Sequence, residues 1–116
     1  MNKFLRARLS EGQPVASICG SVDYLAREGF LTGYKHTGNA QYLWKDYNNY
    51  QNPADFREKQ AVRDKNLVTA NGTAALDFSQ LVLELIGFKR LEAQKAVDLY
   101  RLGFYRFSDK YGNPFI

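Results

Sequence analysis

The chemistry of this chain centres on Cys19, the only cysteine among its 116 residues. It follows the short apolar run VASI, residues 15–18, and it precedes Gly20 and a stretch of helical pattern. A residue at the turn between a strand and a helix is exposed at the rim of a sheet. There the unpaired N–H groups of the helix and its dipole favour a thiolate. Cysteine is also among the most buried residue types, so a core cysteine is the alternative, and the local pattern leaves both interpretations open.

Three positions near Cys19 bear on how it would react. Gly20 adds no side chain that blocks approach, and its N–H is placed to donate to a developing oxyanion. Asp23 follows Cys19 by four residues on a similar helical face. We interpret Asp23 as a solvated carboxylate or a partner of the helix dipole, not as a catalytic group. Thr73, after Gly72 at a second junction, is either a residue of the rim or, more simply, a helix cap.

The composition is that of a globular protein, with 45% hydrophobic and 24% charged residues. A lone cysteine cannot form an internal disulfide and fits a reducing compartment. One His and one Cys argue against a protein-only zinc site, and we predict neither a metal nor a cofactor. No run approaches the roughly 20 apolar residues of a bilayer span, and residues 1–14 lack the apolar centre of a secretory signal. We therefore predict a soluble, cytoplasmic protein with no membrane partner.

Aromatic residues make up 15% of the chain, and the segment QYLWKDYNNYQ interleaves some of them with amides and a lysine. Such a mixture can stack the bases of a single-stranded nucleic acid. The net charge is only +4, however, and the cations are scattered without a recognised nucleic-acid motif. We predict that no nucleic acid binds and that these aromatic side chains pack on the core and rim a pocket.

The elements that must position Cys19 follow from hydrophobic spacing. Residues 15–18 suit a buried parallel strand, and a helix with an apolar inner face follows until Gly29 or Gly33. YKHTGNA is expected to be extended, and residues 61–71 to form two short strands about the turn DKN. Asn39 is interpreted as the cap of a short helix. The helix that follows Cys19 is expected to turn Val22, Leu25, Ala26 and Phe30 toward the core.

Two more helices are predicted after the hairpin, the first from about residue 73 to Gly87 and the second over residues 91–102. Strands that alternate with helices argue for a parallel sheet covered on both faces. The aromatic tail is expected to pack down onto the protein. The predicted inward residues of the last helix are Ala93, Ala96, Val97 and Tyr100.

Three segments carry a resemblance to a known family. ASICGSVDYLAREGFLTG resembles the nucleophile segment of the ThiJ/PfpI family, in the class I glutamine amidotransferase-like superfamily. KHTGN resembles the stretch that follows it, and QAVRDKNLVTANGTAALDFSQLVLELIGF resembles the family's hairpin and closing helix. The resemblance covers about residues 2–88 in the correct order. It implies an α/β fold with a three-layer flavodoxin-like parallel sheet and a nucleophile elbow at Cys19.

The resemblance also implies a missing part. In the family a first half precedes the nucleophile strand and contributes a Glu that hydrogen-bonds the cysteine. That Glu has no counterpart in residues 1–18, since Glu11 lies in a turn. We therefore expect residues 1–116 to be a single, partial ThiJ/PfpI-like domain lacking the N-terminal half, either truncated or one piece of a split protein. Its expected partner is the complementing N-terminal half or a second copy in a homo-oligomer.

The function implied by the resemblance is cysteine chemistry on a small-molecule carbonyl or acyl substrate, of the hydrolase, glyoxalase or deglycase type. Cys19 would attack, Gly20 would hold the oxyanion, and His36 would shuttle a proton, although it lies two residues before the position that often carries His in the family. Without the Glu, weak or no turnover is expected. The alternative is a non-enzymatic redox or stress module, in which Cys19 oxidises to a sulfenic or sulfinic acid, or a remnant that requires a partner chain.

Overall fold

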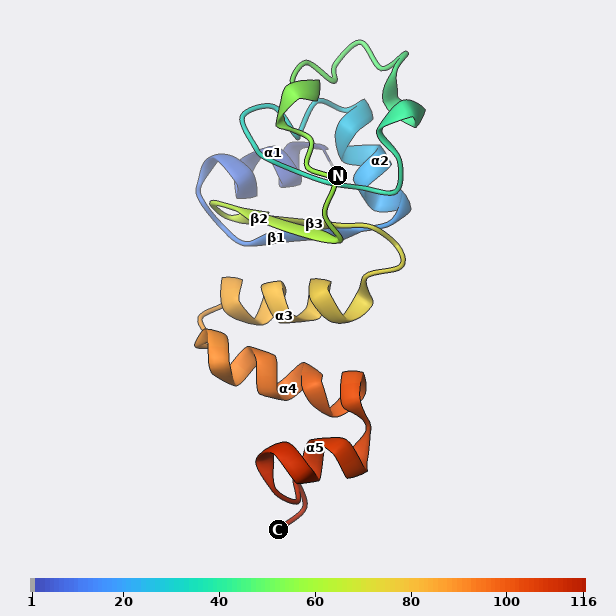
Figure 1. Cartoon of the computed structure of the whole chain (residues 1–116). Coiled ribbons are helices and arrows are strands. Elements are labelled where there is room, and N and C mark those ends of the chain that lie inside the picture. Colours follow the sequence, from blue (N-terminus) through green and yellow to red (C-terminus); the bar gives the residue numbers. More distant parts are fainter. Residues whose placement is uncertain (1) are drawn as a thin grey trace.

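The computed structural model describes residues 2–116, and its centre is a three-stranded sheet (Figure 1). The strands lie in the order β1-β3-β2, so the strand that follows the hairpin turn is the central one. β3 runs parallel to β1 and antiparallel to β2. The bounds are Val15–Ile18 for β1, Ala61–Asp64 for β2 and Leu67–Ala70 for β3.

Helices cover both faces of this sheet. Figure 1 shows α1 and α2 on one face and α3 on the other, which gives the three layers that the sequence predicts. α4 and α5 follow α3 and extend away from the sheet. The bounds are Asn2–Ser10 for α1, Gly20–Arg27 for α2, Ala75–Leu85 for α3, Arg90–Leu102 for α4 and Phe104–Tyr111 for α5, with short 3₁₀ helices η1 at Gln41–Trp44 and η2 at Pro53–Asp55.

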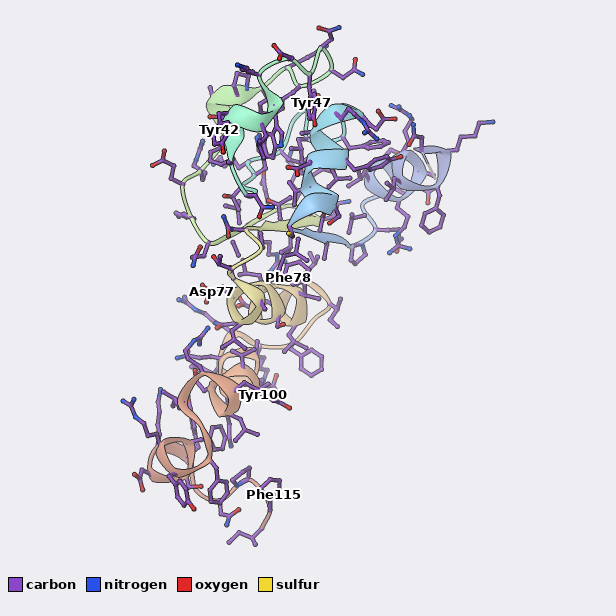
Figure 2. The ribbon with its side chains drawn as sticks, turned by 90° about the vertical axis from the view of Figure 1, so that its right-hand side faces the viewer. Tyr42, Tyr47, Asp77, Phe78, Tyr100 and Phe115 are labelled. Atoms are coloured by element: carbon purple, nitrogen blue, oxygen red, sulfur yellow. The ribbon has the colours of Figure 1, made fainter. Side chains whose placement is uncertain are left out.

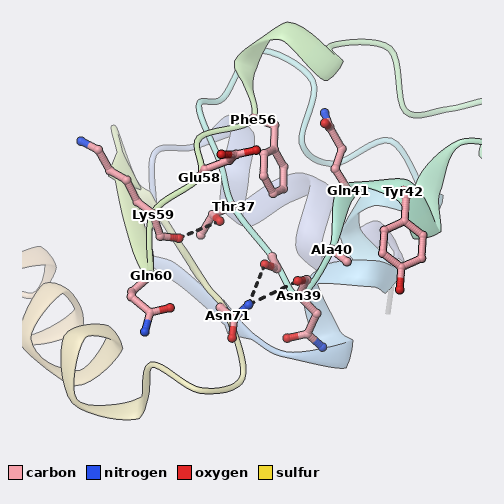
Figure 3. Close-up of a pocket in the computed structure, with 11 residues that line it drawn as sticks. Thr37, Asn39, Ala40, Gln41, Tyr42, Phe56, Glu58, Lys59, Gln60 and Asn71 are labelled. Carbon is pink, nitrogen blue, oxygen red and sulfur yellow. Dashed lines mark hydrogen bonds between the residues drawn. The ribbon is translucent and has the colours of Figure 1, made fainter.

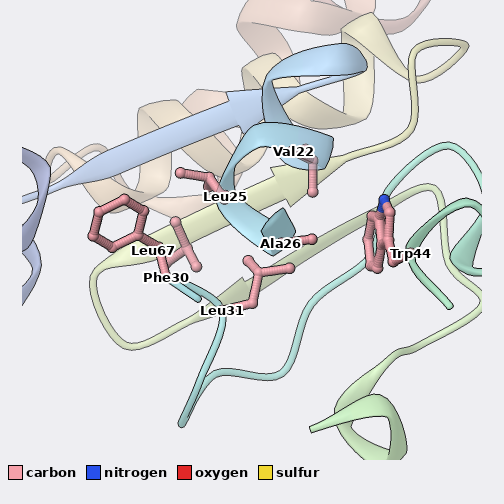
Figure 4. Packing of buried hydrophobic residues seen from close by; sticks show 7 residues of the cluster. All are labelled: Val22, Leu25, Ala26, Phe30, Leu31, Trp44 and Leu67. Carbon is pink, nitrogen blue, oxygen red and sulfur yellow. The ribbon is translucent and has the colours of Figure 1, made fainter. Parts of the chain in front are cut away.

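The main core lies between α2 and the sheet (Figure 4). The predicted inner face of α2 is confirmed, because Val22, Leu25 and Ala26 recur at helical spacing and are all buried. Trp44 closes one end of this core, and its indole N–H donates to the Asp23 carboxylate at 2.7 Å. The buried members of the cluster are Val22, Leu25, Ala26, Phe30, Leu31, Trp44 and Leu67.

The predicted hairpin is also confirmed, with Lys65 and Asn66 between β2 and β3. Lys65 adopts a φ of 52°, in the left-handed region that a tight turn requires. All four residues of β3 are buried, as expected for a central strand with layers on both faces. The C-terminal ends of the parallel pair β1 and β3 therefore meet at one edge of the sheet, where Cys19 follows β1.

The segment YKHTGNA, which was expected to be extended, does not form a full strand. The segment forms only an isolated bridge between His36 and Phe56, and its backbone bonds mostly to loops. The N–H of His36 donates to the carbonyl of Asp55, and the N–H of Thr37 donates to the hydroxyl of Thr69 on β3. The segment therefore pairs with the loop at residues 55–57 and reaches β3 through a side chain, without a backbone ladder to the sheet.

The C-terminal helices form an arm that makes the protein elongated, with extents of 52 × 29 × 22 Å. Figure 2 shows Tyr100 and Phe115 on this arm, far from Tyr42 and Tyr47. Ala93 and Val97 are buried in α4 as predicted, whereas Ala96 and Tyr100 are exposed, contrary to the prediction. α5 packs against α4. No helix within residues 2–116 combines the length and apolar character needed to cross a membrane.

Candidate active site

Cys19 occupies a strained turn between β1 and α2. Its N–H donates to the carbonyl of Ala70 at 3.1 Å, which extends the pairing with β3 by one residue. Its φ of 63° and ψ of −132° lie in a region that non-glycine residues rarely adopt. A strained residue at a strand-to-helix turn is the geometry of a nucleophile elbow. Cys19 is exposed, so the alternative of a buried core cysteine is wrong.

Ser21 closes this turn from the side of the helix. Its hydroxyl donates to the carbonyl of Ile18 at 2.7 Å, accepts from the N–H of Ile18 at 3.0 Å, and lies 2.6 Å from the hydroxyl of Ser17. Ser21 therefore braces the end of β1 and does not cap α2, whose N-cap residue is Cys19. Cys19 itself stands at the N-cap position, and its side chain makes no capping hydrogen bond.

The start of α2 is open to a ligand. The first N–H groups of a helix have no acceptor within the helix, and here no cap side chain takes them. Gly20 is exposed, and a Cβ atom built on it would meet no atom within 4 Å. The backbone N–H groups of Gly20 and Ser21 follow Cys19 directly at this uncapped start of the helix.

Asn39 joins Cys19 to the loop after β3. Its Nδ2 donates to the Cys19 sulfur at 3.3 Å, and its Oδ1 accepts from the N–H of Gly72 at 2.8 Å. The sequence had suggested a helix cap, but the N-cap residue of η1 is Ala40. The contact of Asn39 with Cys19 and Gly72 could have been inferred from the pairing of the strands. Parallel neighbours β1 and β3 end at the same edge of the sheet, so the loops that follow them meet there.

Asn71 and Thr73 organise the rest of this rim. The Nδ2 of Asn71 donates to the carbonyls of Gly38 and Asn39, each at 3.3 Å. The Oδ1 of Asn71 accepts from the N–H and the hydroxyl of Thr73, each at 2.8 Å. Thr73 therefore closes a turn with Asn71 and does not cap α3, whose N-cap residue is Ala74. It lies exposed in the rim loop.

His36 lies in the core and not beside Cys19. Its side chain is fully buried, with Nδ1 2.7 Å from the carbonyl oxygen of Tyr34 and Nε2 2.8 Å from the hydroxyl of Tyr50. The carbonyl can only accept, so Nδ1 carries the proton and Nε2 accepts from Tyr50. Burial lowers the pKa of His36 below its usual value. Both ring nitrogens are occupied, so the structure gives no support to the expected proton shuttle.

The aromatic rings around His36 explain its place in the core. Its ring lies within 6.0 Å of the centroid of Trp44 and also contacts Tyr50 and Phe56 edge-on. The expectation that the aromatic segment packs on the core is confirmed for Trp44, whereas Tyr42 is 74% exposed.

A cavity of about 480 Å³ adjoins Asn39 (Figure 3). Polar side chains supply much of its wall. Because Asn39 lines the cavity and also hydrogen-bonds Cys19, the two share one residue. Across the described part of the chain, no group of three His, Cys, Asp or Glu residues could hold a metal ion. The lining comprises Thr37, Gly38, Asn39, Ala40, Gln41, Tyr42, Phe56, Glu58, Lys59, Gln60 and Asn71.

Comparison with known sequences agrees with this geometry. The chain matches the DJ-1/PfpI family over residues 1–85. It is 54% identical over 114 residues to the uncharacterized protease YdeA of Bacillus subtilis (strain 168), covering 97% of this chain and 58% of that protein. It is 42% identical over 77 residues to the uncharacterized protease YoaZ of the same organism, covering 66% of this chain and 37% of that protein.

Solved structures show the same fold. The crystal structure of a thiJ/pfpI family protein from Bacillus anthracis matches with a TM-score of 0.80 and 31% identity, over 96% of this chain and 55% of that one. A DJ-1 superfamily protein from Agrobacterium tumefaciens matches with a TM-score of 0.72 and 32% identity, over 80% and 50%. The chain spans about half the length of these relatives. The match over residues 1–85, together with the 54% identity to YdeA, establishes that the chain belongs to the DJ-1/PfpI family.

Proposed function

We propose that Cys19 is the nucleophile of a cysteine-dependent, hydrolase-like site for small carbonyl or acyl substrates. The observation that carries the proposal is the exposed sulfur on a residue with a φ of 63°, directly before the open start of α2. Strained backbone persists only where its surroundings hold it, and Ser21 and Ala70 hold it here. The names of the two relatives, as uncharacterized proteases, support acyl-transfer chemistry.

In the proposed reaction the Cys19 thiolate attacks the carbonyl carbon of the substrate. A sulfur–carbon bond forms while the carbonyl electron pair moves to oxygen, and the N–H of Gly20 donates to that oxyanion. Collapse of the intermediate breaks the bond to the leaving group, which takes a proton from solvent and leaves a thioester. Water then hydrolyses the thioester to an acid and the free thiol. The same attack on an aldehyde gives a hemithioacetal, the first step of glyoxalase- or deglycase-like chemistry.

The rate of this reaction is expected to be low. Within residues 2–116 the side-chain hydrogen bond to Cys19 comes from Asn39, a neutral amide, and neither a carboxylate nor an imidazole hydrogen-bonds the sulfur. Proton transfer by a positioned base typically contributes about 100- to 10,000-fold in rate. A site without such a base forms the thioester and then hydrolyses it slowly.

The test is a turnover assay with methylglyoxal and with p-nitrophenyl acetate. We expect weak turnover by the wild-type chain and none above background by Cys19→Ser. Ser10→Ala, at an exposed residue of α1, is the control substitution. Equal rates for wild type and Cys19→Ser would refute a role for Cys19 in either reaction.

A redox role for the same residue is the second candidate. It is favoured by one observation, that the exposed sulfur has a neutral donor, Asn39, and no second cysteine in the chain. Peroxide would then convert Cys19 to sulfenic and then sulfinic acid. Mass spectrometry of peroxide-treated protein distinguishes the candidates, because only the redox role predicts oxidation without any ester chemistry. A single exposed thiol suits a reducing compartment, so we propose the cytoplasm as its location.

The outer edge of β1 supports a proposal about a partner. β1 pairs with β3 on one side only, and beside it lies an apolar groove of about 400 Å³ that includes Leu5, Ala16 and Tyr24. The relatives carry a further portion that this chain does not span. We propose that a segment equivalent to that portion adds a strand to β1, so that residues 1–116 form one part of a two-part domain.

A further inference from the structure

We propose that Asn39 is a catalytic residue that holds the Cys19 thiolate through its amide N–H, in place of a charged partner. The inference deepens the proposed function and rests on it. It concerns how the sulfur is kept reactive within a chain whose described residues place no charged side chain in a hydrogen bond to Cys19.

The orientation of the Asn39 amide follows from its other partner. The N–H of Gly72 is a donor and lies 2.8 Å from Oδ1, so the oxygen of the amide must face Gly72. The nitrogen then faces the sulfur of Cys19 at 3.3 Å. A flipped amide would place two donors together at Gly72 and lose both hydrogen bonds, so the contact to sulfur is made by an N–H group.

The position of Asn39 is held from both sides. The side chain of Asn71 donates to the carbonyl of Asn39 at 3.3 Å, and the carbonyl of the preceding residue, Gly38, accepts from the same nitrogen. Gly38 cannot move inward, because even a Cβ atom there would lie 2.7 Å from the Trp44 ring. The amide is therefore preorganised before any substrate arrives, and donors of this kind stabilise charge without a cost of reorientation.

An N–H donor favours the thiolate over the thiol, since sulfur accepts more strongly when it is charged. The same amide cannot accept the thiol proton, so its contribution is to hold and orient the sulfur. Asn39 also lines the cavity of about 480 Å³, which places the reactive sulfur next to space for a substrate. This role differs from a purely structural one, in which only the bond to Gly72 would matter.

The experiment compares Asn39→Asp with Asn39→Ala by the rate at which iodoacetamide alkylates Cys19 near neutral pH. Aspartate is close in shape to asparagine and keeps an oxygen acceptor for the N–H of Gly72, but it has no N–H for the sulfur. We expect both variants to react roughly 10-fold more slowly than wild type, as for loss of a hydrogen bond to a charged group. Asn48→Asp, at an exposed asparagine, is the matched control and should react at the wild-type rate.

Two results would overturn the inference. If Asn39→Asp reacts as fast as wild type or faster while Asn39→Ala is slow, the bond to Gly72 is what matters and the N–H is dispensable. If neither variant is slowed, Asn39 has no effect on the sulfur. A peptide of residues 15–24 serves as the reference for an unactivated thiol. In both cases, wild type that reacts much faster than this peptide still supports Cys19 as a reactive nucleophile. The proposal about Asn39 and the proposal about Cys19 can therefore fail separately. Thermal unfolding of each variant shows that it is folded.

Discussion

A Cβ atom on Gly72 would lie 2.8 Å from the sulfur of Cys19 and 3.2 Å from Oδ1 of Asn39. Contacts below 3.0 Å to a Cβ atom are essentially absent from proteins, so any side chain at this position would force the sulfur or the loop after β3 to shift. The two residues are far apart in sequence and touch because β1 and β3 are parallel neighbours. The lack of a side chain at Gly72 thus leaves room for the Cys19 sulfur and the Asn39 amide in the site.

We therefore predict that Gly72→Ala displaces the Cys19 side chain or Asn39 and slows alkylation of Cys19 about 10-fold, as loss of the Asn39 hydrogen bond would. The residue is exposed, so the free energy of unfolding should change much less than in a core substitution. Iodoacetamide kinetics and urea unfolding measure the two effects. An unchanged alkylation rate would show that the contact with Gly72 does not position the sulfur.

His36 predicts a specific dependence of stability on pH. Burial lowers the pKa of His36 in the folded state, so the unfolded chain binds a proton first as the pH falls below about 6.5. The free energy of unfolding should then decrease by up to about 1.4 kcal/mol for each pH unit, until the folded state is protonated as well. Because His36 is the only histidine, the effect can be assigned to it.

Urea unfolding of wild type and His36→Asn between about pH 7.5 and 5.5 checks this expectation. The variant should be less stable at every pH, since it loses the contacts with Tyr34 and Tyr50, but its stability should not decline across the window. Parallel declines in both proteins would assign the effect to other groups.

Asp98 connects α4 to α5 and should stabilise the C-terminal arm. It is almost fully buried and accepts from the hydroxyl of Tyr111 at 2.6 Å, from Arg101 at 3.0 Å and from Lys110 at 3.4 Å. We predict that Asp98→Asn destabilises the protein by about 1 to 2 kcal/mol, because hydrogen bonds to a charged acceptor are lost. Asp109→Asn, at an exposed position, is the control.

The sign of the pH effect at Asp98 follows from its pKa. The hydroxyl of Tyr111, together with Arg101 and Lys110, lowers the pKa of Asp98 in the folded state. Its stabilisation is complete above the unfolded value and disappears as the pH falls through the folded value. The stability gap between wild type and Asp98→Asn should therefore be constant near neutral pH and narrow below about pH 4. A gap that widens in acid would contradict this assignment.

The open edge of β1 predicts association. The N–H groups of Val15 and Cys19 donate toward β3, so that of Ala16 points to the opposite edge by the alternation of a strand. We predict concentration-dependent self-association of the isolated chain, because free strand edges pair with other chains. Ala16→Lys, which places a charge at the groove, should reduce it. Sedimentation of a sharply unfolding monomer at all concentrations would argue against an incomplete sheet.

Local patterns predicted much of the fold. The helical spacing of Val22, Leu25 and Ala26 identified the inner face of α2, and the DKN turn identified the hairpin, because both depend on neighbouring residues. The position of Cys19 at a strand–helix turn was also predictable from its flanking sequence. The exposed faces of α4 were not, since helical spacing alone does not show that Ala96 and Tyr100 lie on a side without a neighbouring layer.

The rest of the site depended on contacts between distant residues. Asn39 lies 20 residues from Cys19 in sequence and 33 from Gly72, so only the parallel pairing of β1 with β3 reveals its role. His36 was expected to shuttle a proton for Cys19, from a segment YKHTGNA that was expected to be extended. In the structure no strand forms there, and rings contributed by residues 44–56 enclose His36 in the core.

The most direct test of the proposed nucleophile is transfer of an acetyl group from p-nitrophenyl acetate to the folded chain, followed by mass spectrometry of its peptides. We predict that one acetyl group appears on Cys19, faster than on a free peptide of residues 15–24 in the same buffer. We also predict that it is lost slowly, because no base among residues 2–116 hydrogen-bonds the sulfur. Acetylation of Cys19 no faster than in that peptide, or acetylation of lysines alone, would contradict the assignment of Cys19 as the nucleophile.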